Sequence, residues 1–242
     1  MIHIPHAVDT SELLPHLEDL FRPVKVTSRP TFKSRGRTCR NRRDTFWFGI
    51  RDRDRMPLYR TYATAYGSPS STAISGFKNI VPVSDMPAWI HHALERIRQA
   101  HPHVSKMNHV VVTRYIDDRD TISFHHDKWM DMAPGSDIVS LSIGGARTFG
   151  LQEDDKVTKR FEVCDGDLVI LPYHLNQVAK HKVYPRRNGH VRYSIVARHI
   201  DTFIDPSHTT FFHRGSKEGV TVPGVDKDEP HSDQTFKGKQ PS

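Results

Sequence analysis

The stretch Ser123-Phe124-His125-His126-Asp127 contains an H-x-D pattern. In a short extended segment, side chains two residues apart point the same way, so His125 and Asp127 share one face and His126 points to the other. Two imidazoles and one carboxylate can bind one face of a non-heme Fe(II) and leave its other positions open. Because the chain has 17 histidines, the pattern by itself could arise by chance, and a third ligand is needed.

His181 offers a third imidazole from the stretch K-H-K-V-Y-P, residues 180–185. This stretch has strand-like content and ends at a proline, which favours a β-strand that stops there. A strand gives His181 a defined direction, so it could face the H-x-D pair from elsewhere in the sheet. We therefore predict that His125, Asp127 and His181 hold a metal ion and form the catalytic centre.

Arg192 and Arg198 lie six residues apart in the strand-like run R-Y-S-I-V-A-R. With a side-chain period of two, both project from one face, with Ser194 and Val196 between them. Two guanidiniums on one face repel each other unless a dianion lies there. 2-Oxoglutarate has a carboxylate at each end, and both carboxylates suit the fork geometry of arginine. The alternative is that the two arginines form surface salt bridges on an exposed sheet edge.

From Asn108 to Arg198 the sequence resembles the catalytic core of the AlkB-like Fe(II)/2-oxoglutarate dioxygenases. The landmarks follow in the order of that family: Asn108, a strand at 110–115, Tyr115, the turn Asp117-Asp118, His125-His126-Asp127, a strand at 138–144, Phe149, Gly166-Asp167 followed by 168–171, His181, and the arginines Arg192 and Arg198. The stretch around His181 resembles the corresponding histidine region of the family and precedes Arg192 by eleven residues. These two features favour His181 over His174 and His190 as the third ligand.

The resemblance implies a role for each matching residue. His125, Asp127 and His181 would hold Fe(II). Arg198 would bind the carboxylate of 2-oxoglutarate that chelates the metal, and Arg192 would bind the distal carboxylate.

Three further residues would complete the co-substrate site. Tyr115 would contribute a hydroxyl, and Asn108, which opens the same strand, would lie nearby. Most relatives have an asparagine two residues before this tyrosine, whereas this chain has Thr113, which can donate a hydrogen bond over a shorter reach.

The substrate side departs from the family pattern. Relatives that remove methyl groups from bases often have an acidic residue two positions after the metal aspartate, but this chain has Trp129 there and Asp131 two positions later. The base preference therefore cannot be transferred from the family. An indole could stack on a flipped base, so Trp129 and Asp131 are candidate substrate residues.

The N-terminal third is both basic and aromatic. The formal net charge of the chain is +7, and thirteen Lys or Arg against three Asp lie between Arg22 and Arg60. Basic residues interleaved with aromatic ones suit a phosphate track with stacking surfaces, although a generic basic surface or a flexible arm would have the same composition. In AlkB-like proteins the segment before the core forms a lid, and residues 57–67 resemble the place where such lids meet the core. Arg60 and Tyr62 are therefore candidate substrate residues.

We expect an α+β fold in which a double-stranded β-helix, or jelly roll, forms the core, with flanking helices on one sheet and an N-terminal substrate-recognition lid. Residues 11–21 and 87–100 have apolar residues at helical spacing, with Thr10 or Ser11 as the cap of the first helix. Beyond Asn108 short strands and turns alternate. The expected division is 1–85 for the N-terminal helix and lid, 86–204 for the catalytic core, and 205–242 for a poorly ordered tail.

Cys39 and Cys164 are the two cysteines of the chain, which excludes a disulfide scaffold. The sequence has no apolar leader-like region near residue 1 and no run of eighteen apolar residues, so it gives no support for secretion or membrane insertion. We expect an intracellular protein, cytoplasmic or nuclear, that is a monomer, has no membrane partner and takes DNA or RNA as its substrate.

The resemblance implies a dioxygenase that uses Fe(II), 2-oxoglutarate and O2 to oxidise methyl groups on nucleic-acid bases, as in DNA repair. Oxidation of an N-methyl group releases formaldehyde, together with succinate and CO2. A first alternative is hydroxylation of a carbon-bound methyl group of the thymine or 5-methylcytosine type, on a base or a nucleoside, or of a protein or small molecule. A second is a non-catalytic nucleic-acid binder on a degenerate scaffold, which the intact ligand set and both arginines argue against.

Overall fold

The computed structural model describes residues 1–25, 31–34, 37–40, 43–59, 83–104, 106–117, 119–129, 131–187, 189–205, 210–213 and 220–221. Residues 60–82 of the expected lid and most of the tail after 205 lie outside the described residues. Within the described part, the chain is built mainly from β-strands with a few helices, as expected for a jelly-roll core.

The major sheet has seven strands in the order β1-β12-β9-β14-β7-β4-β6. Their bounds are β1 (Ile2–Ile4), β12 (Leu168–Leu171), β9 (Ile138–Gly144), β14 (Arg192–Arg198), β7 (His109–Tyr115), β4 (Asp44–Gly49) and β6 (Ser84–Asp85). Neighbouring strands are antiparallel, apart from β4 and β6, which pair in parallel. The expected strands at 138–144 and 192–198 are present with the same bounds.

The minor sheet has four antiparallel strands in the order β11-β10-β13-β8. Their bounds are β11 (Lys156–Val163), β10 (Arg147–Glu153), β13 (Lys180–Val183) and β8 (Ile122–His125). β10 and β11 form a hairpin whose turn residues Asp154 and Asp155 both have positive φ, at 47° and 58°. Tight two-residue hairpins need this conformation at both positions, and aspartate tolerates it better than most residues.

Smaller elements complete the described structure. A further sheet has the order β17-β16-β15-β5, with β17 (Val220–Thr221), β16 (Thr210–His213), β15 (Thr202–Ile204) and β5 (Met56–Pro57). β2 (Thr31–Ser34) and β3 (Arg37–Arg40) pair with each other, and the short helix α4 (Tyr173–Val178) lies between β12 and β13 in the chain.

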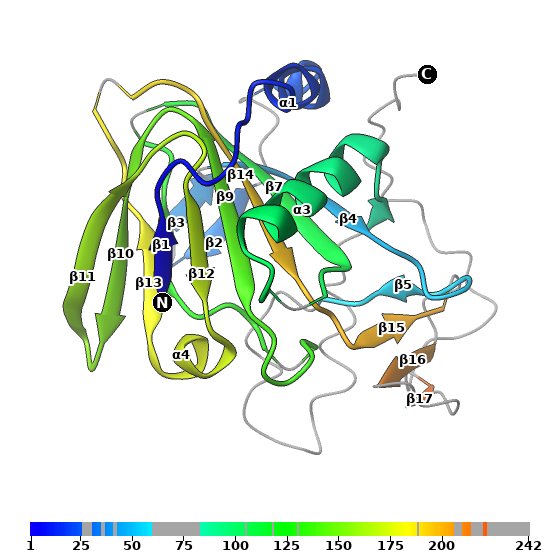
Figure 1. Cartoon of the computed structure of the whole chain (residues 1–242). Helices are drawn as coiled ribbons and strands as arrows, with labels where there is room; N and C mark the ends of the chain where they lie inside the picture. The colour runs from blue at the N-terminus through cyan, green and yellow to red at the C-terminus, as the bar shows by residue number, and fades with distance from the viewer. Residues whose placement is uncertain are drawn as a thin grey trace.

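Two longer helices bury their apolar faces against the major sheet. α1 (Leu14–Phe21) and α3 (Ala88–Ala100) contribute to one apolar cluster together with residues of β7, β9, β12 and β14. Figure 1 shows α3 alongside the major sheet, on the side away from β10 and β11. The members of this cluster from α3 are Ile90, Ala93, Leu94 and Ile97, which follow the helical spacing seen in the sequence.

The first helix begins later than expected, at Leu14, because Thr10 does not cap it. The hydroxyl of Thr10 donates to the carboxylate of Asp165 at 2.8 Å, and Leu13 occupies the N-cap position without a side-chain cap. Pro15 lies in the first turn of the helix, where the missing N–H of proline costs nothing. A tertiary contact therefore uses the side chain that local spacing had assigned to the cap.

The expected boundary between residues 85 and 86 does not separate the sheet from what precedes it. β1, β4 and β6 come from the first 85 residues and belong to the same sheet as β7, β9, β12 and β14. Within the described ranges, no helix is long and apolar enough to cross a membrane.

Candidate active site

A cavity of about 1120 Å³ is lined by residues of both sheets. Alternate residues of β14 line it, namely Arg192, Ser194, Val196 and Arg198. The residues between them face the apolar cluster that α1 and α3 complete. The period of two along a strand thus gives β14 one polar face and one apolar face, and the two arginines share the polar one as the sequence predicts.

His125, Asp127 and His181 come together in this cavity with their ligand atoms within 4.8 Å of one another. Oδ1 of Asp127 lies 3.3 Å from Nε2 of His125 and 3.7 Å from Nε2 of His181. The two imidazoles face each other because His125 of β8 and His181 of β13 are directly paired across the minor sheet. The cross-strand register therefore selects His181, whereas His174 and His190 are exposed residues outside the cavity lining.

Asp127 lies beyond the end of β8, so strand periodicity does not hold it in place. Its backbone is bound at both ends by the side chain of Asn176 from α4: the N–H of Asp127 donates to Oδ1 at 2.9 Å, and Nδ2 donates to the carbonyl of Asp127 at 2.8 Å. The backbone carbonyl of Asn176 also lies 2.6 Å from Nδ1 of His126. Asn176 is fully buried, and its side chain holds the backbone from which the Asp127 carboxylate extends.

The imidazoles are oriented for binding through Nε2. Nδ1 of His125 lies 2.8 Å from the carbonyl of Ser123, which favours a proton on Nδ1 and a lone pair on Nε2. The ring of Phe149 stacks on His181 with centroids 5.8 Å apart and planes 9° apart. Burial lowers the pKa of His181 to about 3, with the nearby His125 acting in the same direction, so the ring is neutral at physiological pH.

The carboxylate of Asp127 is shared between the imidazoles and an arginine. Burial acts to raise its pKa, but the guanidinium of Arg198 and the two histidines hold the pKa well below the ordinary value. Nε of Arg198 donates to Oδ2 at 3.0 Å, and Nη2 of the same arginine bonds the same oxygen. Oδ1 is thereby left on the side of the two histidines.

Two observations show that these residues fit Fe(II) with 2-oxoglutarate. Two neutral imidazole nitrogens and one carboxylate oxygen on one side of a common point are the donor set of a facial Fe(II) site with open positions. Nη1 of Arg192 and Nη1 of Arg198 are buried in the described structure without a hydrogen-bond partner. Buried guanidinium donors need acceptors, and the two carboxylates of 2-oxoglutarate are acceptors of the right kind.

Arg192 is held at the side of the cavity by neighbouring strands. Its Nε donates to the hydroxyl of Ser142 on β9 at 2.9 Å, and its guanidinium lies 5.0 Å from the centroid of the Tyr115 ring on β7. Tyr115 and Thr113 are both buried and line the cavity from β7, where the sequence expects them.

Asn108 does not line the cavity, in contrast to its expected place beside the co-substrate. Its side chain donates to the carbonyl of Ile200 at 2.8 Å and accepts from the N–H of Ile200 at 2.7 Å. Its own backbone N–H donates to the carbonyl of Arg198 at 3.0 Å. Both polar groups of the amide are thus used to fix the chain just after Arg198, which makes Asn108 a structural residue of this strand end.

Of the expected substrate residues, the structure places one in the cavity lining and one outside it. Trp129 lines the cavity, but Asp131 is fully buried outside the cavity lining, where its carbonyl accepts from the N–H of Asp201 at 2.9 Å. Asp131 is therefore not placed to touch a substrate in the cavity. Arg60 and Tyr62 lie outside the described residues.

Sequence reasoning missed several residues of the cavity. Ser140 and Ser142 alternate along β9 and face inward, and their spacing of two in an otherwise apolar run was the available signal. Tyr59 lines the cavity too, its hydroxyl accepts from the N–H of Lys128 at 3.0 Å, and its ring lies 4.8 Å from the guanidinium of Arg198. Tyr59 lies far from the metal residues in the sequence. Asn176 lies five residues before His181, but no local pattern connects it to Asp127.

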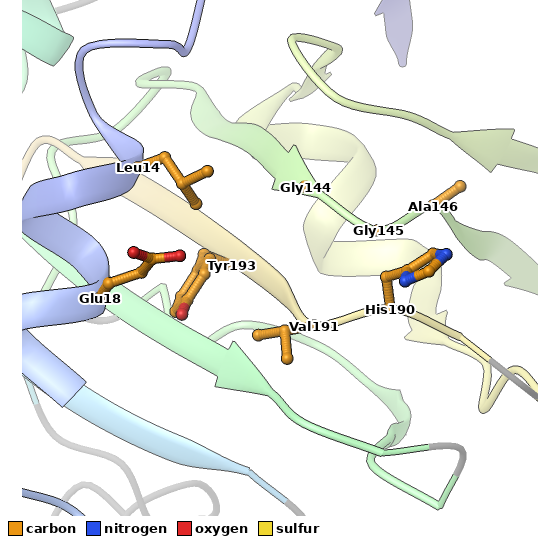
Figure 2. Close-up of a pocket in the computed structure, with 8 residues that line it drawn as sticks. All are labelled: Leu14, Glu18, Gly144, Gly145, Ala146, His190, Val191 and Tyr193. Carbon is orange, nitrogen blue, oxygen red and sulfur yellow. The ribbon is translucent and has the colours of Figure 1, made fainter. Parts of the chain in front are cut away.

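A second pocket of about 500 Å³ lies on the helix side of the major sheet (Figure 2). Figure 2 shows Glu18 of α1 beside Tyr193 of β14, with His190 farther along the same pocket. The described group of potential metal ligands does not include residues of this pocket. In the described part of the chain, the three potential metal ligands all belong to the cavity between the sheets.

Comparison with known proteins agrees with this geometry. The family model of the 2OG-Fe(II) oxygenase superfamily matches residues 1–206. The chain is 34% identical over 121 residues to DNA oxidative demethylase ALKBH2 of Homo sapiens, covering 41% of this chain and 45% of that protein. The mouse protein of the same name is 32% identical over 118 residues, covering 41% of this chain and 49% of that protein. The chain thus spans less than half the length of these curated relatives.

Among solved structures, the structure of OsALKBH1 is similar with a TM-score of 0.45 and 15% sequence identity, covering 81% of this chain and 96% of that chain.

The family match covers most of the chain and includes the three potential ligands and both arginines. The chain is accordingly an oxidoreductase that uses Fe(II) and 2-oxoglutarate, and its resemblance to AlkB-like dioxygenases is confirmed. This chain belongs to the 2OG-Fe(II) oxygenase superfamily.

Proposed function

We propose that this chain oxidises methyl groups on nucleic-acid bases and thereby demethylates N-alkylated DNA or RNA, as in DNA repair. The observation that carries the proposal is the set of aromatic and basic residues that line the cavity beside the potential iron ligands, including Trp47, Trp129, Arg43 and Lys128. Aromatic faces stack on bases and cations bind phosphates. The relatives named DNA oxidative demethylase support the same substrate class.

The cavity has room for both the co-substrate and a base. Its volume of about 1120 Å³ exceeds that of a typical small-molecule pocket. A base enters such a cavity after it is flipped out of its stack, and flat aromatic walls compensate for the stacking that is lost. Trp47 on β4 and Trp129 after β8 provide these walls.

The residues of the chain would act mainly by positioning. His125, Asp127 and His181 would hold Fe(II), which supplies the activation of O2 that is coupled to decarboxylation of 2-oxoglutarate. Arg192 would bind the distal carboxylate of 2-oxoglutarate through its unpartnered Nη1, and Arg198 would bind the chelating carboxylate in the same way.

Tyr115 and Ser142 would set the position of Arg192 within the cavity. Ser142 accepts from its Nε, and the ring of Tyr115 lies beside its guanidinium. The apolar side chains of Val169 and Leu171, which also line the cavity, would exclude water from the co-substrate. The reacting methyl group would then meet the metal in a site whose geometry is already set.

Formaldehyde release from methylated oligonucleotides tests this function directly. We expect the protein with Fe(II), 2-oxoglutarate and ascorbate to release formaldehyde and to form succinate on oligonucleotides that contain 1-methyladenine, 3-methylcytosine or 6-methyladenine. Mass spectrometry of the bases should show the unmethylated base in equal amount. No formaldehyde release from any of the three methylated bases, in either DNA or RNA, would contradict the proposal.

The matched control is the Asp127→Ala variant, which removes one potential ligand of the metal. It should lose both metal binding and turnover, since two imidazoles alone hold Fe(II) weakly. Normal turnover of this variant would remove the assignment of the metal site.

A second candidate is hydroxylation of a carbon-bound methyl group, and Trp129 at the position where relatives often have an acidic residue favours it. Its product keeps the added oxygen. A stable gain of one oxygen on thymine or 5-methylcytosine, without formaldehyde, would select this function. The same result on a free nucleoside, a protein or a small molecule would move the substrate to another class.

A further inference from the structure

The charged side chains that line the cavity are nearly all cationic. The arginines and lysine are Arg43, Lys128, Arg192 and Arg198, and the carboxylate is Asp127. The histidines of the lining add no negative charge in either protonation state. Side-chain cations therefore outnumber carboxylates by four to one in the described lining.

Binding of Fe(II) and 2-oxoglutarate does not reverse this excess of positive charge. Fe(II) brings two positive charges and 2-oxoglutarate brings two negative ones, so the pair adds no net charge. Asp127 is already bonded by two nitrogens of Arg198, and its other oxygen faces the two imidazoles. The described lining holds no carboxylate besides Asp127, and it includes the cationic side chains of Lys128 and Arg43.

The segments that flank the described part of the N-terminal third add no acidic residue either. Residues 24–43 and residues 60–83 contain neither Asp nor Glu, although they contain several Lys and Arg. The excess of positive charge therefore applies to the cavity and to the neighbouring N-terminal sequence alike.

Aromatic walls act in the opposite direction, because the face of a ring attracts cations. The ring of Tyr59 already lies against the guanidinium of Arg198, at 4.8 Å from its centroid. Trp47 and Trp129 offer ring faces that can stack on any base, charged or neutral. Stacking is thus available to charged and uncharged bases alike, whereas the cations of the lining repel only the charged ones.

We propose that the cavity selects methylated bases that are uncharged, such as 3-methyluracil, 3-methylthymine, 1-methylguanine or 6-methyladenine, over the cationic bases 1-methyladenine and 3-methylcytosine. The proposal rests on the proposed function, of which it specifies the substrate class. Its physical basis is the repulsion between a cationic base and Lys128 and Arg43 in a partly desolvated cavity, where charges interact more strongly than in water.

The sharpest test compares 3-methyluracil with 3-methylcytosine at the same position of the same oligonucleotide. The two bases have the methyl group on the same ring nitrogen and differ mainly in charge and in the group on C4. We expect kcat/KM for formaldehyde release to favour 3-methyluracil by roughly tenfold, the order expected for one unit charge about 10 Å away at an effective dielectric constant of about 20. A value that is equal for the two bases, or higher for 3-methylcytosine, would overturn the proposal.

Equilibrium binding provides a readout that does not depend on turnover. The same two oligonucleotides are titrated with the protein in the presence of Mn(II) and 2-oxoglutarate under nitrogen, and their fluorescence anisotropy is followed. The oligonucleotide with 3-methyluracil should bind several-fold more tightly. Equal binding, or tighter binding of 3-methylcytosine, would count against the proposal even for a protein that turned over neither.

Reversal of one charge in the cavity should change the preference itself. In Lys128→Glu the ratio between the two bases should fall toward one or invert, whatever happens to the overall affinity for the oligonucleotide. Arg43→Glu provides a second reversal in the lining, should the first variant fail to fold. Lys156→Glu, on the exposed hairpin of β10 and β11, is the matched control and should leave the ratio unchanged.

The results separate this proposal from the function on which it rests. Formaldehyde from both bases with a preference for 3-methylcytosine would overturn the charge selection and leave demethylation intact. A tenfold binding preference for 3-methyluracil without any formaldehyde would support the charge selection and remove demethylation. A ratio that stayed the same in both charge-reversal variants would assign the preference to something other than Lys128 and Arg43.

Discussion

At the scale of single residues, Asn176 shows how a metal ligand can depend on a distant side chain. Asp127 lies two residues beyond the end of β8, so no ladder of strand hydrogen bonds fixes its backbone. The amide of Asn176 replaces that ladder by binding the N–H and the carbonyl of Asp127 from α4, 49 residues away in the chain. Groups that orient metal ligands commonly change metal affinity by 10 to 100-fold when removed, although they never touch the metal.

We expect Asn176→Ala to weaken Co(II) or Mn(II) binding by about 10 to 100-fold, because the Asp127 backbone loses both of its partners. The measurement is a spectroscopic titration of the metal, with the thermal unfolding midpoint recorded alongside. Gln177→Ala, at the exposed neighbouring position of α4, is the control and should bind metal as the original chain does. Unchanged metal affinity in a folded Asn176→Ala protein would show that Asp127 is positioned by other contacts.

At the scale of elements, β14 divides its residues between two tasks. Arg192 and Arg198 face the cavity, and Ile195 between them is fully buried in the cluster that α1 and α3 complete. The period of two keeps the two sets apart on opposite faces. Stability and co-substrate binding should therefore respond separately to substitutions in one strand of seven residues.

Two substitutions in β14 test this separation. Ile195→Ala should lower the free energy of unfolding by about 2–5 kcal/mol, the usual cost of a cavity in a packed core, with little change in the KM for 2-oxoglutarate. Arg192→Met should raise that KM by roughly tenfold or more, since charged hydrogen bonds are worth that factor, and should leave the metal-free protein about as stable. Urea unfolding and succinate formation are measured on both variants. If each variant changed both the free energy of unfolding and the KM for 2-oxoglutarate, the two faces of β14 would not have separate roles.

At the scale of the whole molecule, two imidazoles enclosed near the cavity make stability depend on pH. His109 is fully buried against the rings of Trp47 and Tyr59, and neither of its ring nitrogens has a hydrogen-bond partner in the described structure. Burial lowers its pKa well below the ordinary value, with Arg198 acting in the same direction. Burial likewise lowers the pKa of His181 to about 3.

The sign of the effect follows from proton linkage. Between pH 6.5, the ordinary pKa of histidine in the unfolded chain, and the lowered pKa of the folded state, the unfolded chain binds more protons. Stability therefore falls as the pH falls through this window. Asp127, whose pKa is also lowered, loses its contribution only below about pH 4, where the unfolded carboxylate would take up its proton.

We expect the metal-free protein to lose roughly 2 kcal/mol of stability per buried imidazole between pH 7 and pH 5. His109→Phe should remove about half of this loss and should unfold at pH 7 within about 1 kcal/mol of the original chain, because one ring replaces another in an apolar site. Urea midpoints at the two pH values give both quantities. His91→Gln, an exposed histidine of α3, serves as the control. An undiminished pH dependence in His109→Phe would show that this ring takes up a proton without unfolding.

The sequence by itself determined which residue types are available to bind a metal and a dicarboxylate. The spacing in the H-x-D pattern and between Arg192 and Arg198 identified the ligand types and the shared face of the two arginines, because strand periodicity is a local property of the backbone. β9 and β14 have the expected bounds for the same reason. Local periodicity could not place Asp127, since that residue lies outside its strand.

The tertiary structure decided which residues meet. It paired His181 with His125 through the register of β13 and β8. It also placed the side chain of Asn108 on the backbone of Ile200, and not in the cavity beside the co-substrate. It also brought the side chain of Asn176 to Asp127 and the ring of Tyr59 to Arg198, and it placed four cationic side chains and one carboxylate in the lining of the cavity. Contacts between segments far apart in the chain depend on how the sheets pair and pack, and no window of sequence contains that information.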